Sequence, residues 1–242
     1  MKNTPRINHF ASAKDASDAA ARYILETIKT ALKEKKRLSV VLPGGSAPKK
    51  LNASIISLSG DMDTSRIDWF FGDERAVDPK SPDSNYRMQM ETLLEPLNIQ
   101  PEHIHRIPGE LGASRAAGEY NLLLADYFSG PPAFDLILLG LGPDGHTASL
   151  FPGSEALSTE DVPVVGTGTA PLKPHVERVT LTFPAINTAG NVIFFTGRTG
   201  KETIIEHLCS AADDSPGKKI YPFESVKPEF GPAVWFVYRN NS

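Results

Sequence analysis

Apolar and polar residues follow one another along this chain in the spacings of helices and strands. Over residues 12–36, apolar residues recur every three or four positions with charged residues between them, which predicts an amphipathic helix. The same criterion predicts further helices over residues 46–58, 84–94, 113–128 and 201–211. Short apolar runs bounded by glycine, proline or polar residues predict strands over residues 38–42, 67–71, 104–107, 134–139, 162–166, 178–183, 191–196 and 233–238.

Predicted strands and helices alternate, and several of the strands are apolar on both faces. This order indicates an α/β fold with a mostly parallel sheet that helices cover on both sides. The length of 242 residues fits one large domain, 1–242, better than two independent domains.

Composition narrows the range of partners. The formal net charge of −4 argues against nucleic-acid binding, which usually needs a basic face. No run approaches the ~20 apolar residues of a membrane span, so we expect no membrane partner. Cys209 is the single cysteine, which excludes an internal disulfide, and with no signal peptide in the sequence we expect a cytoplasmic protein. The expected partner is a small soluble molecule, bound by a monomer or a small homo-oligomer.

Unusual residues gather after the predicted strands, where open parallel sheets bind their ligands. The Gly44-Gly45-Ser46 turn lies between a strand and a helix, so its backbone N–H groups can hold an anion. A plain turn with Ser46 as helix N-cap explains the same residues equally well. The spacing to Lys49 does not fit a Walker A loop.

Charged residues follow two other strands. Arg75, at the end of Asp73-Glu74-Arg75, suits bidentate phosphate binding, although three charges at a strand end also fit a solvated surface. Asn85 lies in a polar segment suited to sugar hydroxyls. Lys201 opens a helix, which is a mildly unfavourable place for a cation and slightly favours a functional role over a surface one.

The glycine-rich segment after the strand at 134–139 carries the strongest candidate for catalysis. Its G-x-G-x-x-G pattern does not predict dinucleotide binding, because Pro152 stops any helix within two turns. His146 lies in this turn and suits proton transfer near neutral pH, with Asp144 placed to orient its ring. A histidine without a catalytic role remains the alternative. The other five histidines give no persuasive metal site, so no metal is expected.

Taken in order from Val40 to about Lys201, these segments resemble the 6-phosphogluconolactonase family. The motifs that carry the resemblance are Leu42–Pro48, Trp69–Arg75, Asp83–Tyr86, Phe134–Pro152 and Arg178–Thr182. The resemblance implies a Rossmann-like three-layer α/β/α domain with a small β excursion, the fold shared with glucosamine-6-phosphate deaminase. It also implies hydrolysis of 6-phospho-D-glucono-1,5-lactone to 6-phosphogluconate, in the pentose phosphate pathway and without a required cofactor.

The resemblance also implies roles for residues of this chain. His146 matches the catalytic histidine, which we expect to act as the general base with Asp144 as its partner. The expected substrate-binding residues are Gly44, Gly45, Ser46, Asp73, Arg75, Asn85, Arg178 and Lys201. Two departures stand out: the Gly197–Lys201 turn is one residue longer than the family pattern, and no aspartate follows Trp235.

Two other functions are less consistent with the sequence. Deaminases of this superfamily carry a glutamate five residues after the histidine, where this chain has Phe151, and tend to have tyrosine in place of Arg75. Sugar-phosphate sensors with this fold carry a DNA-binding domain ahead of it, for which the ~37 residues before the first predicted strand leave no room.

Overall fold

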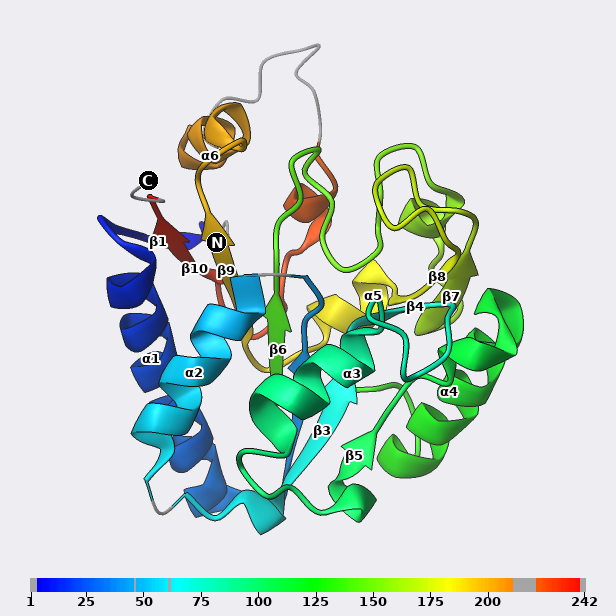
Figure 1. The fold of residues 1–242 in the computed structure, drawn as a ribbon, viewed down its shortest axis with the longest axis horizontal. Helices are drawn as coiled ribbons and strands as arrows, with labels where there is room; N and C mark the ends of the chain where they lie inside the picture. Colours follow the sequence, from blue (N-terminus) through cyan, green and yellow to red (C-terminus); the bar gives the residue numbers. More distant parts are fainter. Residues whose placement is uncertain (1–3, 46, 61, 211–220, 240–242) are drawn as a thin grey trace.

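A computed structural model describes residues 4–45, 47–60, 62–210 and 221–239 (Figure 1). Its main sheet has seven strands in the order β1-β10-β9-β6-β2-β3-β5, and every neighbouring pair is parallel. These strands are β1 (Arg6–Phe10), β2 (Leu38–Leu42), β3 (Ile67–Phe71), β5 (Ile104–His105), β6 (Leu136–Leu139), β9 (Val192–Gly197) and β10 (Val234–Tyr238). The expected mostly parallel sheet is therefore confirmed.

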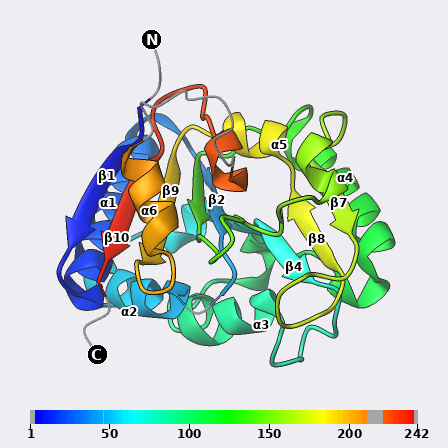
Figure 2. The same ribbon diagram turned by 90° about the horizontal axis from the view of Figure 1, so that it is seen from above.

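Helices cover both faces of this sheet. They are α1 (Ala13–Glu34), α2 (Ala47–Ser59), α3 (Asn85–Gln89), α4 (Ala113–Phe128), α5 (Phe183–Asn187) and α6 (Glu202–Cys209). Seen from above, α2 and α3 lie along one face and α5 lies on the other (Figure 2). Helix α1 begins where the Ser12 side chain accepts a hydrogen bond from the Asp15 N–H, and it buries an apolar stripe that includes Ile24 and Ile28. The three-layer arrangement is confirmed.

A second, antiparallel sheet stands beside the first, in the order β4-β8-β7 (Figure 1). Its strands are β4 (Asp73–Arg75), β7 (Val164–Thr167) and β8 (Arg178–Leu181). Gly72 joins the two sheets, because its N–H donates to the Leu42 carbonyl in the main sheet (3.0 Å) and its carbonyl accepts from the Leu181 N–H in the small one (2.9 Å). This small sheet is the expected β excursion, and it places β4 directly after the end of β3.

Several elements differ from the sequence-based expectation. Strand β1 and helix α5 were not predicted, and 73–75 is a strand where a charged turn was expected. The helix expected over 84–94 ends at Gln89 and continues as a wider π-helical turn over Met90–Leu94. The expected helix start at Ser46 and the end of the last helix at 211 lie outside the described residues. In the described part of the chain, no helix is long and apolar enough to cross a membrane.

The end of the sheet opposite the glycine-rich turns holds a buried carboxylate, Asp68, on β3. It accepts hydrogen bonds from the Arg37 Nε (2.7 Å) and the Tyr127 hydroxyl (2.8 Å), and the His103 Nδ1 lies 2.9 Å away. Burial alone raises the pKa of Asp68, but the hydrogen bonds from these three partners outweigh burial and lower this pKa. The ionised carboxylate is therefore stabilised in the folded state.

We expect Asp68→Asn to lower the free energy of unfolding by about 3 kcal/mol at pH 7, because it removes the charge that the Arg37 guanidinium pairs with. A lowered folded-state pKa stabilises the fold above the unfolded pKa of about 4, and this contribution is lost as the pH falls through the folded pKa. Urea unfolding of both proteins at pH 7 and pH 3 measures this. The difference in free energy of unfolding between wild type and Asp68→Asn should be smaller at pH 3 than at pH 7. A difference that does not depend on pH would contradict this account.

Candidate active site

A cavity of about 410 Å³ opens where β2, β3, β6 and β9 end. This cavity is called the cleft below. Most of the predicted site residues line it, namely Gly44, Gly45, Asp73, Arg75, His146, Arg178 and Lys201. Asn85 and Asp144 do not line the cleft but support residues that do. Ser46 lies outside the described residues.

His146 is held by the glycine-rich turn that follows β6. Its Nδ1 lies 2.5 Å from the Asp144 Oδ1, and its backbone N–H donates to the same oxygen (3.1 Å). A Cβ added at Gly142 would lie 2.0 Å from the His146 Nδ1, so only glycine allows the ring to lie against this turn. The Phe151 ring covers the imidazole at a centroid distance of 4.3 Å. The ring is fixed through Nδ1, which leaves Nε2 as the nitrogen available to a ligand.

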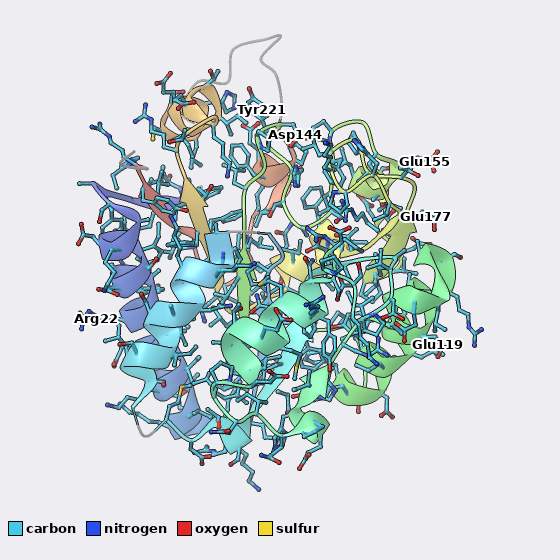
Figure 3. All side chains as sticks on the ribbon, viewed as in Figure 1. Arg22, Glu119, Asp144, Glu155, Glu177 and Tyr221 are labelled. Carbon is cyan, nitrogen blue, oxygen red and sulfur yellow. The ribbon has the colours of Figure 1, made fainter. Side chains whose placement is uncertain are left out.

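The charge state of Asp144 favours one form of this histidine. Burial alone raises the pKa of Asp144. The hydrogen bond with His146 and the attraction between the Asp144 carboxylate and the His146 ring outweigh burial, so this pKa is lowered. An ionised Asp144 accepts the proton on Nδ1, so a neutral His146 carries its lone pair on Nε2. Figure 3 shows Asp144 at the end of the molecule where the loops gather, far from Arg22 and Glu119 at its flanks.

The glycine turn between β2 and α2 forms another wall of the cleft. Gly45 has a φ of +92°, which favours glycine. A Cβ at Gly44 would lie 2.3 Å from the Asn85 Nδ2, so a larger residue would collide with that side chain. Asn85 is 1% exposed, and its amide donates to the carbonyl of Asp73 (2.9 Å) and to its carboxylate (3.2 Å). Asn85 therefore lies behind the wall of the cleft, between Gly44 and Asp73.

Asp73 is fixed on the cleft side of the small sheet. Its Oδ2 accepts a hydrogen bond from the Ser149 hydroxyl (2.6 Å), and the Ser149 N–H donates to the Thr180 Oγ1 (3.1 Å). The neighbouring Glu74 is buried and accepts hydrogen bonds from the N–H groups of Asn85 and Tyr86 (2.7 Å each). The two adjacent carboxylates therefore differ in role. Asp73 lines the cleft, and Glu74 accepts the hydrogen bonds of the first N–H groups of α3.

Two arginines are direct neighbours in the small sheet, because Arg75 on β4 pairs in register with Arg178 on the adjacent strand β8. Arg178 is 3% exposed, and its Nη2 donates to the Pro174 carbonyl (2.7 Å). Among the described residues, its Nε and Nη1 and the Nε of Arg75 have no hydrogen-bond partner. Burial and the charge of Arg75 lower the pKa of Arg178. A buried and a half-buried guanidinium side by side, each with a free Nε donor, indicate a place for an anion.

Lys201 adds a cation from the end of β9. Its Nζ donates to the Thr196 Oγ1 (2.8 Å), and burial lowers its pKa. No carboxylate lies within ion-pair distance of it in the described part of the chain. Strands β9 and β3 lie on opposite sides of β6 in the sheet, so Lys201, which follows β9, and Arg75, which follows β3, approach the turn after β6 from opposite sides.

The cleft residues that the sequence did not single out include Leu172 and Lys173, which lie in the segment between β7 and β8. Nothing in the local sequence pattern identifies them as site residues. The segment is held beside the cleft by contacts distant from these residues, such as the hydrogen bond from Arg178 to the Pro174 carbonyl. Among the residues with described positions, no group of three or more His, Cys, Asp or Glu side chains is placed to hold a metal ion.

Comparison with known proteins gives the same family over nearly the whole chain. Residues 11–235 match the family described as glucosamine-6-phosphate isomerases/6-phosphogluconolactonase. A 6-phosphogluconolactonase from Nostoc sp. is 36% identical over 220 residues, which is 88% of this chain and 87% of that protein. The human 6-phosphogluconolactonase is 32% identical over 237 residues, covering 96% of this chain and 90% of that one.

Solved structures agree with the sequence comparison. The 6-phosphogluconolactonase from Trypanosoma brucei has a TM-score of 0.84 at 30% identity, covering 97% of this chain and 96% of that chain. The enzyme of the same name from Thermotoga maritima has a TM-score of 0.82 at 29% identity, covering 97% and 99%. This chain belongs to the glucosamine-6-phosphate isomerase/6-phosphogluconolactonase family.

Proposed function

We propose that this chain hydrolyses 6-phospho-D-glucono-1,5-lactone to 6-phosphogluconate in the oxidative pentose phosphate pathway. One observation carries the proposal: His146, held by Asp144, lies in a cleft that four cationic side chains also line, namely Arg75, Lys173, Arg178 and Lys201. A base beside an anion site is what hydrolysis of a phosphorylated ester requires. Relatives named 6-phosphogluconolactonase that align over most of the chain support this choice of reaction.

His146 acts as the general base in the proposed mechanism. Its Nε2 takes a proton from a water molecule as the oxygen of that water attacks C1 of the lactone. Backbone N–H groups of the glycine-rich turns stabilise the oxyanion that forms. The C1–O5 bond then breaks, and the imidazolium returns its proton to the departing ring oxygen. Asp144 holds the ring in the tautomer that this transfer needs.

The cations and the Gly44-Gly45 turn bind the substrate. Lys201 and the N-terminal end of α2 offer donors on one side of His146, and Arg75 with Arg178 offers donors on the other. Binding of the phosphate, which is remote from C1, fixes the lactone for attack. The reaction needs no cofactor in this scheme.

Deamination of an amino sugar phosphate is the main alternative within the family. The ring of Phe151 lies 4.3 Å from the His146 ring, so an apolar side chain stands where a deaminase needs a carboxylate to help open the sugar ring. We therefore expect no ammonia release from glucosamine 6-phosphate above background. Steady ammonia release would contradict the lactonase assignment.

The direct test is acid release from freshly made 6-phosphogluconolactone, followed by pH-stat at neutral pH and low temperature. The spontaneous rate is measured without protein and subtracted. We expect wild-type protein to accelerate acid release well above this rate and to saturate with substrate. A rate equal to the spontaneous one for a folded protein would refute the proposed function.

A further inference from the structure

We propose that Gln89 is a positioning residue for substrate binding: its buried side-chain amide holds the Pro43 carbonyl and thereby aims the Gly44 N–H into the cleft. The proposal rests on the proposed function in one respect, namely that the Gly44-Gly45 turn receives the phosphate of the substrate. Gln89 is not part of the wall of the cleft. It therefore acts through the backbone of the turn and not on the substrate.

The amide of Gln89 is fixed at both ends. Gln89 is the last residue of α3 and is 0% exposed. Its Nε2 donates to the Pro43 carbonyl at 2.8 Å, and its Oε1 accepts from the Asn52 Nδ2 at 2.8 Å. Asn52, on α2, is 1% exposed. Since Asn52 supplies a donor and Pro43 an acceptor, this network permits only one orientation of the Gln89 amide.

Peptide geometry carries the effect from Gln89 to the cleft. The peptide bond between Pro43 and Gly44 is planar and trans, so its carbonyl and its N–H point in opposite directions. The carbonyl points to Gln89, in the buried layer between α2, α3 and the sheet, and the N–H therefore points away from that layer. Gly44 lines the cleft, and its N–H has no hydrogen-bond partner among the described residues. A donor held in this way needs no rearrangement to meet an anion.

The wide turn after α3 completes the support. Asn52 Nδ2 also donates to the Thr92 Oγ1 (2.8 Å), and that hydroxyl donates to the Met88 carbonyl (2.7 Å). Thr92 lies in the π-helical turn Met90–Leu94. Such turns are rare in proteins, and those that occur are often found near functional sites. Five polar groups thus bond to one another, namely the side chains of Gln89, Asn52 and Thr92 and the carbonyls of Met88 and Pro43, and of these only Pro43 lies outside α2, α3 and the π-helical turn. An apolar side chain could fill this layer, but it could not hold the carbonyl.

Gln89→Leu tests the proposal, because it keeps the approximate volume and removes the donor to Pro43. We expect the dissociation constants of inorganic phosphate and 6-phosphogluconate, measured by calorimetry, to rise about five- to tenfold. The KM for 6-phosphogluconolactone should rise by a similar factor, and kcat should stay within about twofold because His146 and Asp144 are untouched. Gln89→Met also removes the donor to Pro43 and matches the length of the glutamine side chain, so it should weaken both ligands as well.

Asn121, which is half-buried, offers a control for the loss of a side-chain amide that holds the backbone. Its Nδ2 donates to the Val164 carbonyl (2.9 Å) and its Oδ1 accepts from the Val164 N–H (2.9 Å), away from the cleft. We expect Asn121→Leu to lower the Tm, as Gln89→Leu does, and to leave both dissociation constants unchanged.

The outcomes separate this proposal from the proposed function. If Gln89→Leu and Gln89→Met bind both ligands as tightly as wild type, Gln89 is structural only and the proposal is wrong. If wild-type protein binds neither ligand, the proposal is wrong as well. If wild type binds phosphate, the variants lose that binding, and no lactone is hydrolysed by any of them, the positioning role stands and the lactonase assignment fails.

Discussion

Replacing His146 with alanine is expected to reduce kcat for lactone hydrolysis by about 10²- to 10⁴-fold, the usual contribution of a positioned general base. The imidazole is the single titratable ring that lines the cleft in the described structure, and Asp144 leaves its Nε2 free to accept a proton. The KM should change little, because the cations and the glycine turn that bind the substrate remain. Acid release with the spontaneous rate subtracted measures both constants.

A second histidine variant controls for general effects of removing a ring. His9 lies exposed on the edge strand β1, away from the cleft, and His9→Ala should keep wild-type kcat. Circular dichroism and the Tm of both variants must match those of the wild type before rates are compared. If folded His146→Ala protein keeps more than half of the wild-type kcat, the general-base mechanism is wrong even if the chain is a lactonase.

The sequence predicts the sheet well because the strands that build it are buried on both faces. Strands β2, β3, β6 and β9 are mostly apolar and buried along their length, and the turn that follows each one carries the glycines or charges of the cleft. Because parallel strands bring their carboxyl ends to one edge, the convergence of these loops was predictable without knowing the strand order. The order itself and the assignment of each cation to one side of His146 needed the structure.

Features that depend on contacts distant in sequence were not predictable. Strand β1 lies at the sheet edge and holds only exposed and half-buried residues, so its apolar signal is weak. Strand β4 is three charged residues long, and it is a strand only because β8 pairs with it. Nothing in the local pattern distinguishes Gln89 from a surface glutamine on a helix, because its role depends on a carbonyl 46 residues away. Lys173 reaches the cleft only through the fold of the segment before β8.

Replacing Arg178 with methionine is expected to reduce kcat/KM by about 10²-fold while leaving the free energy of unfolding unchanged to within about 1 kcal/mol. The guanidinium offers two buried donors that have no partner among the described residues, and losing charged hydrogen bonds to a substrate has an effect of this size. In the free protein the same group is desolvated and faces Arg75, so its removal relieves unfavourable terms that offset the lost bond to Pro174.

Arg37 is expected to have a structural role and no role in binding. Comparing Arg37→Met with Arg178→Met therefore distinguishes a structural arginine from one that binds the substrate. Its guanidinium donates to the Asp68 carboxylate and to the Ser65 carbonyl, outside the cleft. Arg37→Met should therefore lower the free energy of unfolding by about 2 kcal/mol or more and leave kcat/KM unchanged. Urea unfolding and initial rates of acid release on both variants give the comparison. If Arg178→Met destabilised the fold as much as Arg37→Met and kept its kcat/KM, Arg178 would be a structural residue. The anion site would then rest on Lys201, Arg75 and the Gly44-Gly45 turn.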